Sequence, residues 1–141
     1  MLFLDVDDLK VINDSLGHEA GDTMLQVAAQ RLQQSVRTED VVARLGGDEF
    51  VAMLFGSSPR DVLDRLSERM HAALAEPMRI GDTTLRITAS IGIAPIAERD
   101  TRDAAAILRD ADLAMYQAKR LGRGKKTAYF SAELVDSNGS A

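Results

Sequence analysis

The sequence predicts an α+β fold, an α/β sandwich whose central, mainly antiparallel sheet is flanked by helices. Short runs that are rich in β-branched or alternating apolar residues predict strands. Longer stretches with an apolar residue every three or four positions predict amphipathic helices. The Gly46-Gly47-Asp48 step lies between two of the short runs and indicates a β-hairpin, because glycine reaches positive φ without steric cost. This order of segments suits helices packed on one sheet.

The predicted elements form one domain, residues 1–130, followed by a tail, residues 131–141, with the composition of a linker. The predicted strands are residues 1–6, 41–43, 50–55, 83–88, 89–95 and 127–130. Helical spacing of apolar residues occurs within residues 25–36, 62–74 and 104–118. Pro77 closes the second of these helices, and Gly122 is placed to cap the third.

The first strand carries acids on one face. With a side-chain period of two, alternate residues from Leu2 to Val6 share one face, while Phe3, Asp5 and Asp7 share the other. Clustered carboxylates repel one another and usually need a cation, and oxygen ligands without cysteine favour magnesium over zinc. The alternative is a strand that runs into a hydrophilic turn. That alternative explains Asp7 and Asp8, which follow the apolar run, well. It explains Asp5, which lies within the run, less well.

The hairpin presents a second pair of acids. Asp48 and Glu49 follow the two glycines, whose missing side chains leave room for a bulky ligand. If the strand of Asp5 lies beside this hairpin, the acids can share a pair of metal ions. The alternative is an ordinary hairpin with solvated acids, because turns are rich in glycine and aspartate.

Polar and small residues dominate residues 9–22, on the approach to the first helix and in its first turns. Asn13, His18 and Asp22 lie there. Amide and carboxylate side chains can read the N1–H and N2 donors of guanine. Their alternative roles are helix caps and Asx turns, and a histidine such as His18, taken alone, is more often a capping or packing residue than a ligand.

Together these residues resemble the GGDEF family of diguanylate cyclases. The resemblance rests on DVDDLKVIND at residues 5–14, GHEAGD at 17–22 and GGDEF at 46–50. It continues through ASIGIA at residues 89–94 and YQAKRLGR at 116–123, and so covers nearly the whole chain. It implies a fold like that of nucleotide cyclases and polymerase palm domains. It also implies a further helix before the first strand, and this sequence starts on the strand itself.

The resemblance implies a role for each acid of the two clusters. Asp5, the carbonyl of Val6 and Asp48 would hold Mg²⁺, two ions per site, with Mn²⁺ as an alternative. Asp48 or Glu49 would assist removal of the proton from the attacking 3′-hydroxyl.

The resemblance also implies which side chains bind the substrate GTP. Asn13 and Asp22 match the guanine readers, with His18 close by. Lys119 and Arg123 match the residues that reach the phosphates, and on a helix their spacing of four puts them on one face. The neighbouring basic residues are better explained as a helix C-terminus that complements the helix dipole.

A regulatory site is implied by Arg37-Thr38-Glu39-Asp40. In the family, an Arg-x-x-Asp tetrad at this spacing before the signature binds the product and inhibits. Arg37 offers a planar fork for guanine, and Asp40 can accept from its N1 and N2 donors. The alternative is a polar surface loop that leaves a helix.

Composition supports one globular domain. The chain has 141 residues, 45% hydrophobic and 28% charged, enough for one core. A net charge of −5 argues against a nucleic-acid polymer as partner. With no cysteine, no apolar run of membrane-spanning length and no signal peptide, we expect a cytoplasmic domain, with any membrane anchor outside this chain.

Three hypotheses for function follow. The first is a diguanylate cyclase that joins two GTP molecules into cyclic di-GMP and two pyrophosphates, as a homodimer in which each subunit offers one GTP. The second is a catalytically quiet module that binds GTP or cyclic di-GMP and regulates an attached domain, such as an EAL phosphodiesterase. The third is an interaction domain without this chemistry. The intact acids favour the first hypothesis, in a longer protein fused to sensor or EAL domains.

Overall fold

The structure is a computed structural model that describes residues 1–56, 59–96, 102–122 and 126–130. The strands of these residues are β1 (Leu2–Val6), β2 (Val41–Gly46), β3 (Glu49–Met53), β4 (Met78–Ile80), β5 (Thr83–Leu85), β6 (Ala89–Ile93) and β7 (Lys126–Tyr129). Their helices are α1 (Leu9–Leu16), α2 (His18–Ser35), α3 (Arg60–Leu74) and α4 (Ala104–Arg120). The predicted tail lies outside the described residues.

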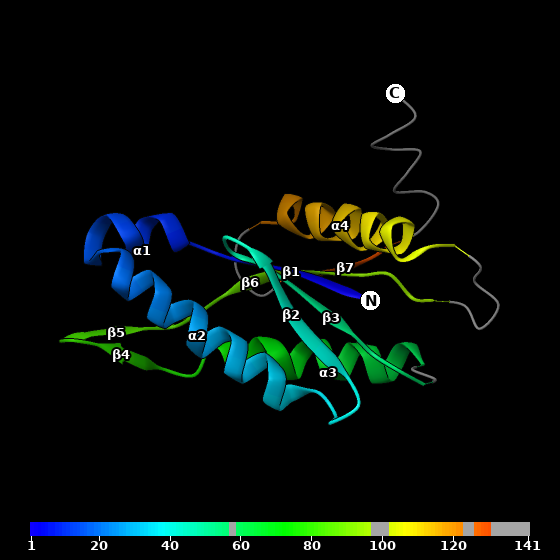
Figure 1. The fold of residues 1–141 in the computed structure, drawn as a ribbon, viewed down its shortest axis with the longest axis horizontal. Helices are drawn as coiled ribbons and strands as arrows, with labels where there is room; N and C mark the ends of the chain where they lie inside the picture. The colour runs from blue at the N-terminus through cyan, green and yellow to red at the C-terminus, as the bar shows by residue number, and fades with distance from the viewer. Residues whose placement is uncertain (57–58, 97–101, 123–125, 131–141) are drawn as a thin grey trace.

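The described strands form one five-stranded sheet in the order β2-β3-β1-β6-β7 and a separate β4–β5 hairpin. Neighbouring strands of the large sheet run antiparallel, except for the parallel pair β6 and β7. Helix α4 packs on one face of this sheet, and α2 and α3 cover the other face (Figure 1). The predicted sandwich with a mainly antiparallel sheet is confirmed.

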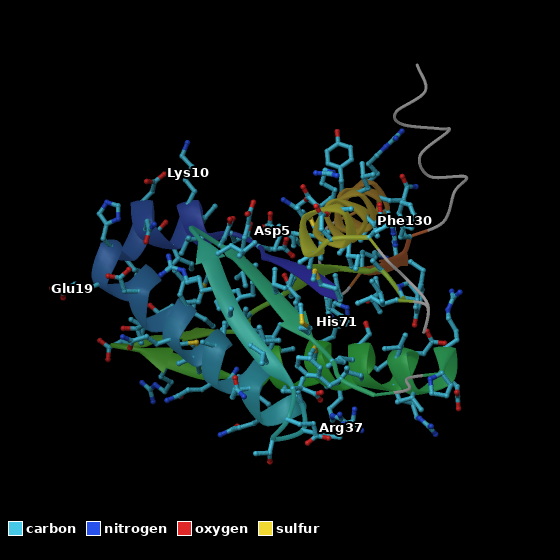
Figure 2. The ribbon with its side chains drawn as sticks, turned by 45° about the vertical axis from the view of Figure 1, so that its right-hand side comes forward. Asp5, Lys10, Glu19, Arg37, His71 and Phe130 are labelled. Carbon is cyan, nitrogen blue, oxygen red and sulfur yellow. The ribbon has the colours of Figure 1, made fainter. Side chains whose placement is uncertain are left out.

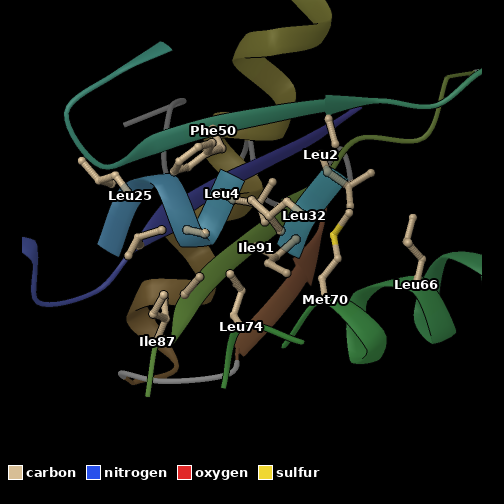
Figure 3. Close-up of a cluster of buried hydrophobic side chains, with 14 of the residues drawn as sticks. Leu2, Leu4, Leu25, Leu32, Phe50, Leu66, Met70, Leu74, Ile87 and Ile91 are labelled. Carbon is tan, nitrogen blue, oxygen red and sulfur yellow. The ribbon is translucent and has the colours of Figure 1, made fainter. Parts of the chain in front are cut away.

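Strand β1 lies in the middle of the sheet, and all of its residues are buried. Leu2, Leu4 and Val6 join the core beneath α2 and α3, where each fully buried leucine is worth about 1.5–3 kcal/mol (Figure 3). Phe3 belongs to a second cluster, together with residues of α4. The predicted alternation is therefore confirmed, and it brings Asp5 out on the α4 face.

Gly92 lets α4 approach the sheet closely. A Cβ atom at this position would lie 2.0 Å from the backbone nitrogen of Met115 and 2.3 Å from the carbonyl oxygen of Ala111. Both atoms are backbone, so they cannot swing away from an added methyl group. The close contact fixes α4, and with it Lys119 near the end of the helix, against the middle of the sheet.

The polar segment before α2 forms a helix of its own, which differs from the prediction of a single helix with an irregular approach. Gly17 separates α1 from α2 because its φ of 94° is readily accessible only to glycine. Its N–H donates to the carbonyl of Asn13 at 3.0 Å and closes α1. Asn13 thus lies within α1, while His18 and Asp22 lie in the first turns of α2.

Other boundaries differ modestly from the prediction. Strand β4 was not predicted; it pairs with β5 across a turn at Gly81, whose φ is 60°. The strand predicted at residues 83–88 ends at Leu85, and β2 extends to Gly46. None of the described helices is long and apolar enough to cross a lipid bilayer.

Candidate active site

Three carboxylates meet where β1 ends beside the β2–β3 hairpin. Asp5 lies directly opposite Glu49 in the antiparallel register, and Asp48 occupies the hairpin turn. Asp5, Asp48 and Glu49 each offer an oxygen atom within 4.8 Å of the others. The N–H of Val6 donates to the carbonyl of Asp48 at 2.9 Å and ties the turn to the strand. The condition stated from the sequence, that the strand of Asp5 lies beside the hairpin, is therefore met.

The hairpin turn depends on its two glycines. Gly46 and Gly47 have φ values of 151° and 52°, which side chains rarely adopt. A Cβ at either position would meet no described atom within 4 Å, so the backbone there is open to an approaching ligand. The Nε–H of Arg44 donates to the carbonyl of Gly47 at 2.9 Å and braces the turn.

Lys119 provides the cation that faces this acidic cluster. Its Nζ lies 2.6 Å from Oδ2 of Asp5, across from the hairpin. Burial raises the pKa of Asp5 to about 6; the hydrogen bond from Lys119 opposes this shift, and the charge of Asp48 adds to it. Burial alone would lower the pKa of Lys119, but the bond to Asp5 outweighs it, so the pKa is raised.

A cleft of about 410 Å³ opens over these groups. Its walls are the end of β1, the first residues of α1, Asp48, Ser90, Lys119 and Gly122. Figure 2 shows Asp5 between the tip of the β2–β3 hairpin and α4. Carboxylate oxygens that converge from two strands form the donor set preferred by hard divalent cations, so the residues present fit Mg²⁺.

The predicted guanine readers lie on the two helices beyond this cleft. Asn13 is half-buried, and His18 and Asp22 are exposed. A Cβ at Gly21 would lie 1.8 Å from Oδ1 of Asn13, so this glycine is what lets the amide sit between α1 and α2. Asp22 borders a separate hollow of about 330 Å³ that Arg44 also lines. The structure therefore places these residues near one another but outside the walls of the acidic cleft. Arg123 lies outside the described residues, and α4 ends three residues before it.

Arg37 and Asp40 lie at the far end of the β2–β3 hairpin from Asp5 (Figure 2). Asp40 is buried; its Oδ2 accepts from the N–H of Arg37 at 3.0 Å, and its Oδ1 accepts from the N–H of Phe55 at 3.0 Å. Burial raises its pKa, but the bonds from Phe55 and Arg37 outweigh burial and lower it. Both carboxylate oxygens are thus engaged inside the protein. Arg37 is the exposed member of the pair.

The hollow beside Arg37 contains basic residues that the sequence did not single out. It measures about 300 Å³ and is lined by Arg65 and Arg69 of α3 as well as Arg37. Sequence reasoning also missed Thr88 and Ser90 beside the acidic cleft. Thr88 donates from Oγ1 to Oδ2 of Asp7 at 2.7 Å, and its carbonyl accepts from the N–H of Asp7 at 2.9 Å. A sequence signal for both was present, since Thr88 and Ser90 are polar residues two positions apart in a run that is otherwise rich in apolar and β-branched residues.

The comparisons with known proteins agree with this geometry. A family model described as "Diguanylate cyclase, GGDEF domain" matches residues 1–125. The chain belongs to the GGDEF family. The chain is 46% identical over 139 residues to the diguanylate cyclase TpbB of Pseudomonas aeruginosa. This match covers 96% of the chain and 31% of TpbB. It is 41% identical over 123 residues to the bifunctional diguanylate cyclase/cyclic di-GMP phosphodiesterase MucR of the same species, covering 87% of the chain and 18% of MucR.

A solved structure supports the same assignment. The GGDEF domain of TpbB from Pseudomonas aeruginosa superposes with a TM-score of 0.83 at 44% identity, covering 96% of this chain and 77% of that one. The match confirms the GGDEF fold predicted from the sequence. The chain spans less than a third of the length of these two curated relatives.

Proposed function

We propose that this GGDEF domain is a diguanylate cyclase that condenses two GTP molecules into cyclic di-GMP and two pyrophosphates. The observation that carries the proposal is the meeting of the Asp5, Asp48 and Glu49 carboxylates. Asp5 and Asp48 line one cleft together with Lys119. Acids and a cation in this arrangement suit transfer of a nucleotidyl group, which needs charge neutralised on phosphates and a proton removed from a hydroxyl.

Asp5, the carbonyl of Val6 and Asp48 would hold Mg²⁺, or Mn²⁺ in its place. Ions held by these residues would supply Lewis-acid chemistry that polarises the α-phosphate and offsets charge on the leaving pyrophosphate. The bond from Val6 to the carbonyl of Asp48 supports this assignment, because it fixes the end of β1 relative to the turn.

The acidic cluster also takes up the proton of the attacking hydroxyl, and basic residues bind the phosphates. Glu49 or Asp48 accepts the proton of the 3′-hydroxyl as its oxygen attacks the α-phosphorus of the other GTP. The bond from that phosphorus to the β-phosphate oxygen breaks, and pyrophosphate leaves. Lys119, together with Arg123, binds the phosphates.

The guanine base lies against α1 and α2. The Asp22 carboxylate would accept from the N1–H and N2 donors of guanine, and the Asn13 amide can both accept and donate at the same edge, with His18 beside them. The half-buried position of Asn13 between the two helices favours this role, since its amide is already held in place.

The reaction joins two identical halves, so two protomers must face each other, each with one GTP. The domain would therefore work as a homodimer and would be fused in a longer protein to sensor or EAL domains. The bifunctional name of MucR, a cyclase and phosphodiesterase in one protein, supports such a fusion.

Cyclic di-GMP would inhibit by binding beside Arg37. The hollow that Arg37 shares with Arg65 and Arg69 supports the proposal, because guanidinium groups pair with phosphates and stack on bases. Asp40 would accept from the N1 and N2 donors of guanine, and its existing bonds from the N–H groups of Arg37 and Phe55 support this role because they hold the carboxylate in place.

Asp48→Ala tests the mechanism, with Asp14→Ala, an exposed acid of α1, as the matched control. Pyrophosphate release from GTP with Mg²⁺ should fall at least a hundredfold in Asp48→Ala and stay at the unsubstituted level in the control, while circular dichroism shows both variants folded. Release that persists in folded Asp48→Ala would remove Asp48 from the mechanism.

A further inference from the structure

Ser90 is a buried polar residue in the wall of the acidic cleft. It lies on β6, is 1% exposed, and lines the same cleft as Asp5 and Lys119. Its hydroxyl has no hydrogen-bond partner among the described residues. A buried hydroxyl without a partner destabilises the protein that carries it, so this one calls for an explanation.

The sheet register brings Ser90 next to Asp5. The two residues are directly opposite each other in the antiparallel pair of β1 and β6. Directly paired residues point to the same face, with Cβ atoms about 4.5–5.5 Å apart. The neighbours of Ser90 on β6, Ala89 and Ile91, point into the core beneath α2 and α3 instead. The hydroxyl is therefore within reach of the Asp5 carboxylate.

In the structure Lys119 supplies a hydrogen bond to Asp5, at 2.6 Å. Under the proposed function Lys119 also serves the nucleotide phosphates. When the Lys119 ammonium group turns to a phosphate, its hydrogen bond to Asp5 is weakened. Ser90 is then a neutral donor placed beside that carboxylate, and unlike Lys119 it does not compete electrostatically with a bound cation.

We propose that Ser90 is a positioning residue for Asp5, whose hydroxyl donates a hydrogen bond to the Asp5 carboxylate when a metal-bound nucleotide occupies the cleft and draws Lys119 away. This inference rests on the proposed function, because it takes Asp5 as a metal ligand. The competing explanation is that Ser90, like Gly92 on the same strand, is present only because α4 leaves space for a small residue.

The test compares Ser90→Ala and Ser90→Thr with the unsubstituted protein. The probe is 3′-deoxy-GTP, which lacks the attacking hydroxyl, titrated by calorimetry at several Mg²⁺ concentrations. We expect Ser90→Ala to weaken the Mg²⁺-dependent affinity about tenfold, the loss typical of one hydrogen bond to a charged group. The melting temperature of free Ser90→Ala should equal or exceed that of the unsubstituted protein, because the change removes an unpartnered buried hydroxyl. Ser90→Thr keeps the hydroxyl and should retain most of the affinity.

Three results would overturn the inference. Ser90→Ala that binds as tightly as the unsubstituted protein would show that the hydroxyl does nothing for Asp5. Ser90→Ala with a lower melting temperature and a matching loss of affinity would assign Ser90 a packing role. An unsubstituted protein that fails to bind 3′-deoxy-GTP with Mg²⁺ would overturn the proposed function, and this inference with it, whereas the first two results leave the proposed function intact.

Discussion

Asp5→Asn should stabilise the free protein while abolishing turnover. The Asp5 side chain is 9% exposed, and burial, opposed by the Lys119 hydrogen bond, raises its pKa from 3.8 to about 6. Because the folded-state pKa is higher, protonation of Asp5 stabilises the fold fully below pH 3.8, and this stabilisation is lost as pH rises through about 6. The gap between the two pKa values corresponds to about 3 kcal/mol. Lys119, which is 42% exposed, can be solvated when its ionic partner is replaced.

Urea unfolding from pH 4 to pH 8 measures this effect. The free energy of unfolding of Asp5→Asn should exceed that of the unsubstituted protein only slightly at pH 4. The difference should grow by up to about 3 kcal/mol by pH 8, with most of the growth below pH 7. Groups that do not interact with Asp5 titrate alike in both proteins and cancel in the difference. Asp14→Asn, in the exposed part of α1, is the matched control for a carboxylate-to-amide change outside the acidic cluster. A pH-independent difference for Asp5→Asn, or a variant that is less stable at pH 8, would refute the reasoning.

Three further substitutions probe the framework. Gly92→Ala places a methyl group 2.0 Å from the backbone of α4. Urea unfolding should therefore show a free energy of unfolding lower by about 2 kcal/mol or more, the cost of an overpacked core. An unchanged midpoint would contradict the close packing. Gly47→Ala puts a side chain at φ 52°, which should cost about 1 kcal/mol and lower pyrophosphate release through the displaced turn; full activity would show that the turn tolerates it. Asp40→Ala leaves the N–H of Phe55 without its acceptor and should lower stability by about 1–3 kcal/mol in thermal unfolding, whereas Glu39→Ala, on the exposed loop, should change it by less than about 0.5 kcal/mol.

The sequence predicted the site's acids because strand periodicity has few alternatives. A period of two puts Asp5 on the face away from Leu4, and a glycine pair permits a tight hairpin, so both acidic motifs could be located before the structure was known. Their pairing across β1 and β3 depends on the order of strands in the sheet. From the sequence it could be said only that the acids would meet if the strand of Asp5 lay beside the hairpin.

Other features depend on tertiary contacts that leave little trace in the sequence. The Lys119 bond to Asp5 spans 114 positions and exists because Gly92 admits α4. The sequence predicted Asp40 as an acceptor for guanine, and that role stays a prediction. The structure adds that its oxygens accept from the backbone N–H groups of Phe55 and Arg37, a contact that the sequence did not reveal. Residues 131–141 were predicted as a linker, and that prediction lies outside the described residues.

The most direct test of the account is mass spectrometry of the nucleotides formed when concentrated protein is incubated with GTP and Mg²⁺. We predict cyclic di-GMP with two pyrophosphates for each molecule formed, at a rate that rises faster than linearly with protein concentration because two protomers must meet. Tight GTP binding without cyclic di-GMP, in folded protein at high concentration, would contradict the assignment of the cleft to catalysis and favour a module that only binds nucleotide.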